Sequence, residues 1–107
     1  MQDSIKIERL SHNAAEVTNI LRAVSNQKRL QLLCVMAKGK ISAGDLAGEI
    51  SCGQSCTSQH LGYLRRHDLV LTQQEGTTVY YSLSAHTRTL LLNLLPLVPG
   101  LFTEKTV

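Results

Sequence analysis

Two cysteines stand four residues apart in the segment ISCGQSCTSQHLGYLRR, residues 50–66 of the chain. Cys52 falls in an expected turn and Cys56 on the first turn of an expected helix, where a thiol ionises more easily and is more reactive. The pair suits oxidation, persulfidation or binding of a soft ion such as arsenite or a thiophilic metal. A disulfide requires the turn to distort, because disulfide geometry is strict. The alternative is that both cysteines only pack, Cys52 in the turn and Cys56 as a small residue.

The same segment carries polar side chains of the types that read DNA bases. Gln pairs with adenine through two hydrogen bonds, and the hydroxyl of Ser or Thr contacts several bases and phosphates. The side chains of these types on one edge of the expected helix, called the reading edge below, are Gln54, Ser55, Ser58 and Gln59. Arg65 and Arg66 follow, where they would contact the DNA backbone and position the domain. The alternative is an ordinary solvated helix face.

Hydrophobic spacing indicates the elements that position these residues. The expected elements are helices over residues 11–24, 25–39, 42–50 and 54–67, two strands around a turn at 75–76, and a helix over 85–95. Ser25 or Asn26 is the expected cap of the second helix, and Ser42 and Ser84 cap the third and the last. The fold class is mainly α with a small β-hairpin, a winged helix-turn-helix in the order α-α-α-α-β-β-α. In that motif the second helix of the pair, here the fourth helix, enters the major groove.

Two helices carry apolar positions that must be buried. In the fourth helix, the positions expected to face inward are Thr57, Leu61, Leu64 and Asp68. The last helix contains LLLNLL and is apolar nearly all round, so another surface must cover it. A second copy of the same helix is the expected cover, which makes the protein dimeric. The alternative is that this helix packs within its own domain.

Composition bounds the class of protein. The 107 residues, 43% hydrophobic and 18% charged, suit one domain over 1–107, with a core over about 11–98 and a tail over 99–107. The net charge of +3 fits a polyanion partner without requiring one. No signal peptide or membrane span is expected, and three cysteines, an odd number, indicate reduced thiols in the cytoplasm. The 8 acidic residues are scattered, so no catalytic set and no enzyme is expected.

Residues 42–84 closely resemble the ArsR/SmtB family of bacterial repressors. The residues that match the family pattern are Ser42, Gly44, Asp45, Leu46, Gln54, Ser55, Ser58, His60, Leu61, Leu64, Arg65, Leu69, Val70, Tyr80, Tyr81 and Leu83. The segment SNQKRLQLL also resembles a family motif, with Gln27 where proline is usual, and Gly53 stands where Ser usually caps the fourth helix. The resemblance covers roughly residues 14–95.

The resemblance implies a homodimeric winged-helix repressor that binds a palindromic operator and releases it when an inducer arrives. It implies dimer contacts through the first and last helices, whose apolar side chains are Val17, Ile20, Leu21, Leu90, Leu91, Leu94 and Leu95. It also aligns His60 with a family histidine, which either contacts DNA or packs where the helix meets the wing.

The usual metal sites of the family are not expected in this chain. The segment ISAGDLAG has no cysteine, and the last helix keeps only His86, which cannot complete a tetrahedral site by itself. Cys34 resembles a cysteine of thiol-sensing members, but the second cysteine that those members carry in the last helix is missing. Cys34 is therefore either a sensing candidate, together with Cys52 and Cys56, or a small buried hydrophobe.

The inducer stays open among an oxidant, a persulfide, and arsenite or a soft metal held by Cys52 and Cys56, and no other cofactor is expected. The operator, and whether the protein represses or activates, also stay open. Two hypotheses of other classes are a thiol metal buffer without specific DNA binding and a winged helix used for protein contact.

Overall fold

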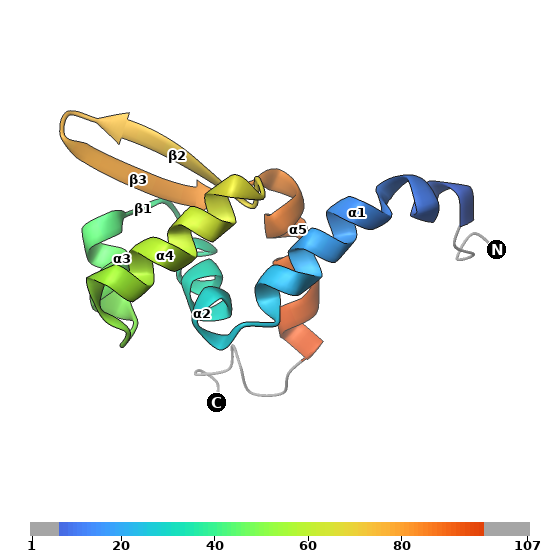
Figure 1. Ribbon diagram of the computed structural model, residues 1–107, viewed down its shortest axis with the longest axis horizontal. Coiled ribbons are helices and arrows are strands. Elements are labelled where there is room, and N and C mark those ends of the chain that lie inside the picture. Colours follow the sequence, from blue (N-terminus) through green and yellow to red (C-terminus); the bar gives the residue numbers. More distant parts are fainter. Residues whose placement is uncertain (1–6, 98–107) are drawn as a thin grey trace.

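Helices and strands follow one another in nearly the expected order over residues 7–97, which the computed structural model describes. The elements are α1 (Ile7–Val24), α2 (Gln27–Met36), β1 (Ile41–Ser42), α3 (Ala43–Glu49), α4 (Gly53–Arg66), β2 (Val70–Glu75), β3 (Thr78–Leu83), α5 (Ala85–Leu94) and a short 3-10 helix, η1 (Leu95–Leu97). Figure 1 shows the β2–β3 hairpin extending to one side of the helices and α1 extending to the other. The expected tail, 99–107, lies outside the described residues.

Side-chain caps explain where α2 and α3 begin. The backbone N–H of Arg29 donates to Oδ1 of Asn26 at 3.0 Å, so Asn26 and not Ser25 caps α2. The N–H of Asp45 donates to Oγ of Ser42 at 3.1 Å, as expected. Within the described residues, the Ser84 hydroxyl makes no such bond to the start of α5; it donates to the carbonyl of Leu69 at 3.0 Å instead. Ser84 thus occupies the N-cap position of α5 as expected, but its hydroxyl ties α5 to the start of the wing instead of capping the helix.

The wing belongs to a three-stranded antiparallel sheet in the order β1-β3-β2. Strands β2 and β3 pair from Val70 with Leu83 to Glu75 with Thr78, and Gly76 makes the turn at φ +65°. The added strand β1 pairs Ile41 with Tyr81 and Ser42 with Tyr80. Sequence patterning missed β1, because two residues are too short to show an alternating pattern.

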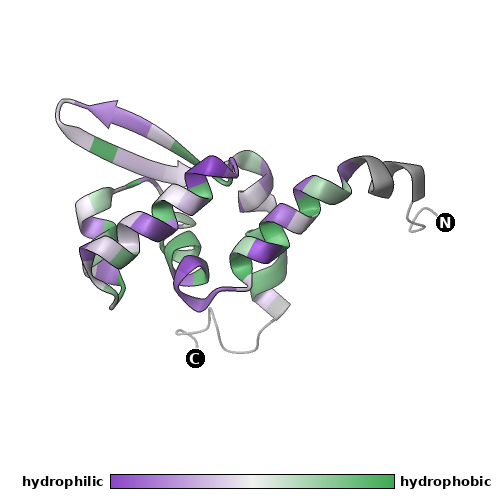
Figure 2. Cartoon of the chain, viewed as in Figure 1, coloured by the Kyte–Doolittle hydropathy of each residue, from purple (hydrophilic) through white to green (hydrophobic). Residues whose placement is uncertain are grey.

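Aliphatic side chains from the helices and from the sheet form one core around α2. The fully buried leucines and methionine are Leu32, Leu33, Met36, Leu46, Leu64, Leu69 and Leu91. Figure 2 shows hydrophobic residues on α2 and α5, in the middle of the arrangement. Their burial leaves one edge of α4 and the whole hairpin tip free to meet a partner.

The end of α4 differs from the expectation. Asp68 was expected to face inward but is exposed, and its φ of 59° lies in the left-handed region. The N–H of Asp68 donates to the carbonyl of Arg65 at 3.1 Å, and that of Leu69 to the carbonyl of Leu64 at 3.0 Å. These two bonds form a Schellman motif, which stops the helix and turns Leu69 into the core in place of Asp68.

Candidate nucleic-acid interface

The reading edge lies on the solvent side of α4. Its side chains Gln54, Ser55, Ser58 and Gln59 are all exposed. The opposite side of the helix is anchored by Thr57, Leu61 and Leu64, which are 2%, 3% and 0% exposed. The spacing predicted both faces of the helix correctly apart from Asp68. A rigid helix with a polar edge and a free N-terminus has the shape of a major-groove reader.

Arg65 and Arg66 are exposed in the last turn of α4, beyond the reading edge. Cations at the carboxyl end of a helix also interact favourably with the helix dipole. Their position suits contacts with phosphates rather than with base edges.

His60 is half-buried on α4, and its environment disfavours the charged ring. Burial lowers the pKa of the imidazole below its ordinary value of 6.5, and the Arg29 cation lowers this pKa further. A neutral imidazole can donate one hydrogen bond and accept another, whereas a phosphate contact is favoured by the charged ring. The structure therefore places His60 beside the reading edge without making it a cation.

Arg29 ties α4 to the end of α1, a role that sequence analysis missed. Its Nε donates to the carbonyl of Ala23 and its Nη2 to that of Arg22, both at 3.2 Å. The guanidinium also lies 4.0 Å from the centroid of the Tyr63 ring on α4. The available signal was the arginine in the segment SNQKRLQLL, which was matched as a motif without a role.

Cys52 and Cys56 are joined by a disulfide across the start of α4. Cys52, and not Gly53 as expected, occupies the N-cap position; Cys56 lies one turn into the helix, and the Cα atoms of the two cysteines are 5.5 Å apart. Gly53, between them, has a φ of +78°, a conformation that residues with a side chain rarely adopt. The turn is irregular where the disulfide closes, as expected: Gly53 has a positive φ and the backbone of Cys52 is neither helical nor extended. Two of the reading-edge residues, Gln54 and Ser55, lie inside the closed loop.

Cys34 keeps a free thiol and is half-buried on α2. Burial raises the pKa of this thiol, and the nearby Lys38 cation offsets the rise only in part. The protonated thiol is a poor nucleophile, so the environment of Cys34 favours the packing alternative.

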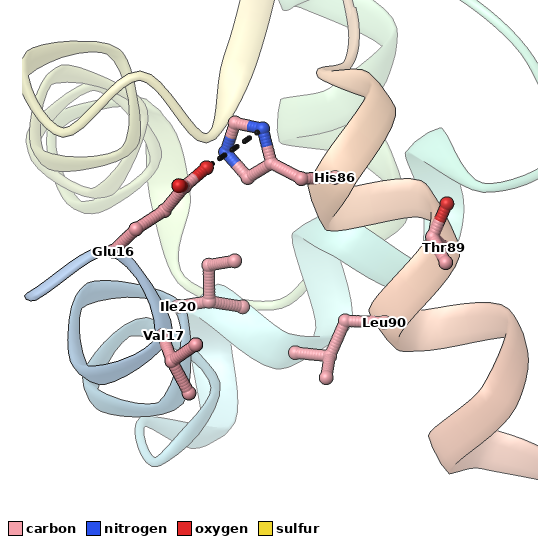
Figure 3. A pocket seen from close by; sticks show the side chains of 6 residues that line it. All are labelled: Glu16, Val17, Ile20, His86, Thr89 and Leu90. Atoms are coloured by element: carbon pink, nitrogen blue, oxygen red, sulfur yellow. Dashed lines mark ion pairs between the residues drawn. The ribbon is translucent and has the colours of Figure 1, made fainter. Parts of the chain in front are cut away.

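A groove of about 400 Å³ lies between α1 and α5. Figure 3 shows the side chains that line it, which are Glu16, Val17, Ile20, His86, Thr89 and Leu90. Oε2 of Glu16 lies 3.4 Å from Nδ1 of His86 at the rim, and this contact is an ion pair when the imidazole is protonated. His86, at the start of α5, is therefore a partner of α1.

Four exposed apolar side chains belong to α1 and α5, and one of them, Val17, lines this groove. Val17, Leu21 and Leu94 are 39%, 50% and 36% exposed, and Leu92, which sequence analysis left out, is 48% exposed. The other expected interface residues differ: Ile20, Leu91 and Leu95 are 6%, 0% and 7% exposed, and Leu90 is half-buried. Ile20, Leu91 and Leu95 are corrected to core residues of the protomer, because one face of each apolar helix packs inward.

Comparison with known proteins identifies the family. The family described as "Bacterial regulatory protein, arsR family" matches residues 26–72. The transcriptional activator HlyU of Vibrio cholerae is 38% identical over 81 residues, which are 76% of this chain and 75% of HlyU. The chain belongs to the arsR family.

Solved structures of arsR-type regulators share the fold. HlyU from Vibrio cholerae has a TM-score of 0.75 over 79% of this chain and 94% of its own. The transcriptional repressor BigR from Xylella fastidiosa has a TM-score of 0.77 at 33% identity, over 87% of this chain and 96% of its own. A homodimeric winged helix-turn-helix DNA-binding domain from Mycobacterium bovis has a TM-score of 0.71 at 25% identity, over 91% of this chain and 88% of its own. In this arsR-family chain, α3 and α4 are the helix-turn-helix and β2 and β3 form the wing.

Metal-binding clusters and membrane-spanning helices are two further features that bear on the class of this arsR-family protein. Among the side chains that the structure describes, no group of three or more His, Cys, Asp or Glu residues is arranged to hold a metal ion. Over residues 7–97, none of the helices has the length and apolar character needed to cross a membrane.

Proposed function

We propose that this DNA-binding transcriptional regulator acts as a homodimer on a palindromic operator, with α4 of each protomer in the major groove. The observation that carries the proposal is the reading edge, four exposed polar side chains on a helix whose other side is locked into the core. Gln54 and Gln59 are the proposed readers of adenine, and Ser55 and Ser58 contact bases or phosphates. Such a role places the protein in the cytoplasm.

The residues beyond the reading edge position the helix. Arg65 and Arg66 neutralise phosphates, which holds the domain in register without carrying sequence information. His60, whose charged form is disfavoured by burial and by Arg29, is proposed to make a hydrogen bond beside the reading edge. The homodimer is supported by the exposed leucines of α1 and α5 and by the homodimeric relative from Mycobacterium bovis.

The proposed inducing event is oxidation of Cys52 and Cys56. The disulfide closes a loop around Gln54 and Ser55, so it restricts the first turn of α4, where base contacts are made. Binding to DNA requires these side chains to adjust to the bases, and a restrained turn opposes that adjustment. Reduced protein is therefore expected to bind the operator and oxidised protein to release it, as a repressor does.

A soft-metal or arsenite inducer is the second candidate, because the Cα atoms of the two cysteines lie 5.5 Å apart and their sulfurs come close enough for one soft ion to bridge both. It predicts that arsenite, added to reduced protein without an oxidant, lowers operator affinity. A thiol metal buffer predicts tight metal binding and equal affinity for all DNA.

Fluorescence anisotropy on a fragment of the protein's own promoter tests the proposal. The Gln59→Ala variant is expected to lose about 1–3 kcal/mol of discrimination between operator and unrelated DNA, because a two-bond base contact is lost. Gln31→Ala, an exposed glutamine on α2, is the matched control and keeps this discrimination. Arg66→Ala is expected to weaken binding to every DNA sequence by about the same factor. It should also lower, by about 1, the steepness with which the logarithm of the binding constant falls with the logarithm of the salt concentration. Operator discrimination untouched by Gln59→Ala would place the reading edge elsewhere.

A further inference from the structure

Cys52 occupies the N-cap position of α4, where the end of a helix stabilises a thiolate. An N-cap side chain faces the free N–H groups of the first helical turn and normally accepts a hydrogen bond from one of them. Within the described residues, Cys52 makes no such capping bond while its sulfur is bound to Cys56. When the disulfide opens, a Cys52 thiolate becomes the anion for which these donors are free. Cys56 lies one turn further into the helix.

The charges around the loop favour the same sulfur. The first turn of α4, GQSC, contains no acidic residue. Nζ of Lys28, at the start of α2, donates to the carbonyl of Ser51 at 3.4 Å, which places a cation beside the residue that precedes Cys52. A helix N-terminus and a nearby ammonium both stabilise a thiolate. The hydroxyl of Thr57 lies 3.7 Å from the Cys52 sulfur but donates its proton to the carbonyl of Gly53 at 2.7 Å, so Lys28 and the helix N-terminus are the groups that favour the thiolate.

We infer that Cys52 and Cys56 form a thiol–disulfide exchange site, with Cys52 as the attacking thiol, Cys56 as the resolving thiol, and a low-molecular-weight disulfide as the substrate. The inference rests on the proposed function in one respect, that oxidation of this pair is the inducing event. Both cysteines are half-buried at the surface of the turn, so a small disulfide reaches them. Cys34 is a bystander, because burial raises the pKa of its thiol.

The exchange balances in two steps. The Cys52 thiolate attacks one sulfur of the substrate disulfide, forms a mixed disulfide and releases the other half as a thiolate. Cys56 then loses its proton and attacks the Cys52 sulfur, which releases the second half as a thiolate and closes the protein disulfide. Two electrons pass from the protein dithiol to the substrate, and the two released thiolates take up protons as their basicity requires.

Mass spectrometry of mixed disulfides tests the order of attack. Full-length reduced protein carrying Cys34→Ala is mixed with oxidised glutathione, and the Cys56→Ser and Cys52→Ser variants are compared after circular dichroism has shown that each is folded. Cys56→Ser is expected to accumulate one glutathione on Cys52, because no resolving thiol remains. Cys52→Ser is expected to react at Cys56 at least roughly tenfold more slowly. Equal rates, faster reaction at Cys56, or no adduct on either variant would overturn the inference.

A charge variant separates activation of Cys52 from mere exposure. Lys28→Gln is expected to slow adduct formation on Cys52 several-fold, whereas Lys38→Gln, which removes the cation beside Cys34, leaves that rate unchanged. An unchanged rate in Lys28→Gln overturns the assigned role of this cation.

Failure of this inference and failure of the proposed function give different results. If no glutathione adduct forms but the reduced variants still select the operator, the exchange site is wrong and the DNA-binding function stands. If the adduct and the disulfide form but oxidised protein binds the operator as tightly as reduced protein, the exchange site stands and the proposed inducing event fails.

Discussion

At the scale of single residues, His60 connects the chemistry of α4 to pH. Its folded-state pKa lies below the ordinary value of 6.5, because burial and Arg29 disfavour the charged ring. The unfolded chain therefore binds a proton more readily than the folded chain does. The stability that His60 contributes is fully present when the pH lies above the ordinary pKa. It is lost as the pH falls from that ordinary pKa toward the lower folded-state pKa. This loss of stability at low pH comes from the His60 ring and not from the net charge of the protein.

The His60→Gln variant is expected to remove this part of the pH dependence. Urea unfolding at about pH 7.5 and about pH 5.5 measures it, since the wild type loses more free energy of unfolding between the two pH values than the variant does. Gln59→Ala, a neighbouring change without a titratable group, keeps the wild-type loss and serves as the control. An identical loss in wild type and His60→Gln would show that the folded protein does not disfavour the charged ring.

Residue types and spacing predicted which side chains face solvent better than they predicted contacts across the fold. The reading edge, Thr57, Leu61 and Leu64 follow from the helical period alone. The Arg29–Tyr63 contact depends on how α2 crosses α4, which no local pattern contains. The Cys52–Cys56 disulfide closes around Gly53, whose φ is positive. The sign of a glycine's φ cannot be read from the sequence, because glycine adopts both signs about equally readily.

At the scale of elements, the end of α4 sets the angle at which the wing leaves the helix. Asp68 holds a left-handed conformation there, and the two backbone bonds of the Schellman motif keep it in place. An L-residue is strained in this region, Asp less than most and Gly hardly at all. The motif is therefore kept at a cost in stability.

The Asp68→Gly variant is expected to raise the free energy of unfolding by about 0.5–1 kcal/mol, because the strain disappears. Asp68→Ala has neither the freedom of Gly nor the polar side chain of Asp, so it is expected to be less stable than the wild type. Urea denaturation of the three proteins checks this order of Gly, Asp and Ala. A Gly variant less stable than the wild type would mean that the Asp68 side chain supplies more than the strain costs.

Element boundaries were predictable where a local signal marks them. Asn26 and Ser42 are capping residues, and α2 and α3 begin directly after them. Ser84 has the same residue type and precedes α5, yet its hydroxyl is used by the carbonyl of Leu69 from the start of the wing. Local sequence predicts that a serine here is bonded, but only the folded chain decides to which partner.

At the scale of the whole molecule, exposed apolar side chains gather on α1 and α5, far from the reading edge. The hydropathy pattern predicted a covered surface on α5 but could not separate its two faces, because the helix is apolar nearly all round. Packing separates them: Leu91 lies in the core, whereas Leu92 and Leu94 face outward. A dimer made through the outward faces sets two α4 helices at a fixed spacing, which a palindromic operator requires.

Leu94→Glu is the change that tests this arrangement. A charge in the middle of an apolar contact is left without a partner, so the variant is expected to sediment as a folded monomer. Its operator affinity should fall steeply, because one protomer contacts one half-site. Leu71→Glu is the matched control: Leu71 is 56% exposed on β2, outside α1 and α5, and this variant should remain a dimer. Leu91→Glu instead puts a charge into the core and should unfold the protomer. If the Leu94→Glu protein is still a dimer with full operator affinity, the dimer interface does not lie on α5. Another element would then have to hold the two α4 helices at their spacing.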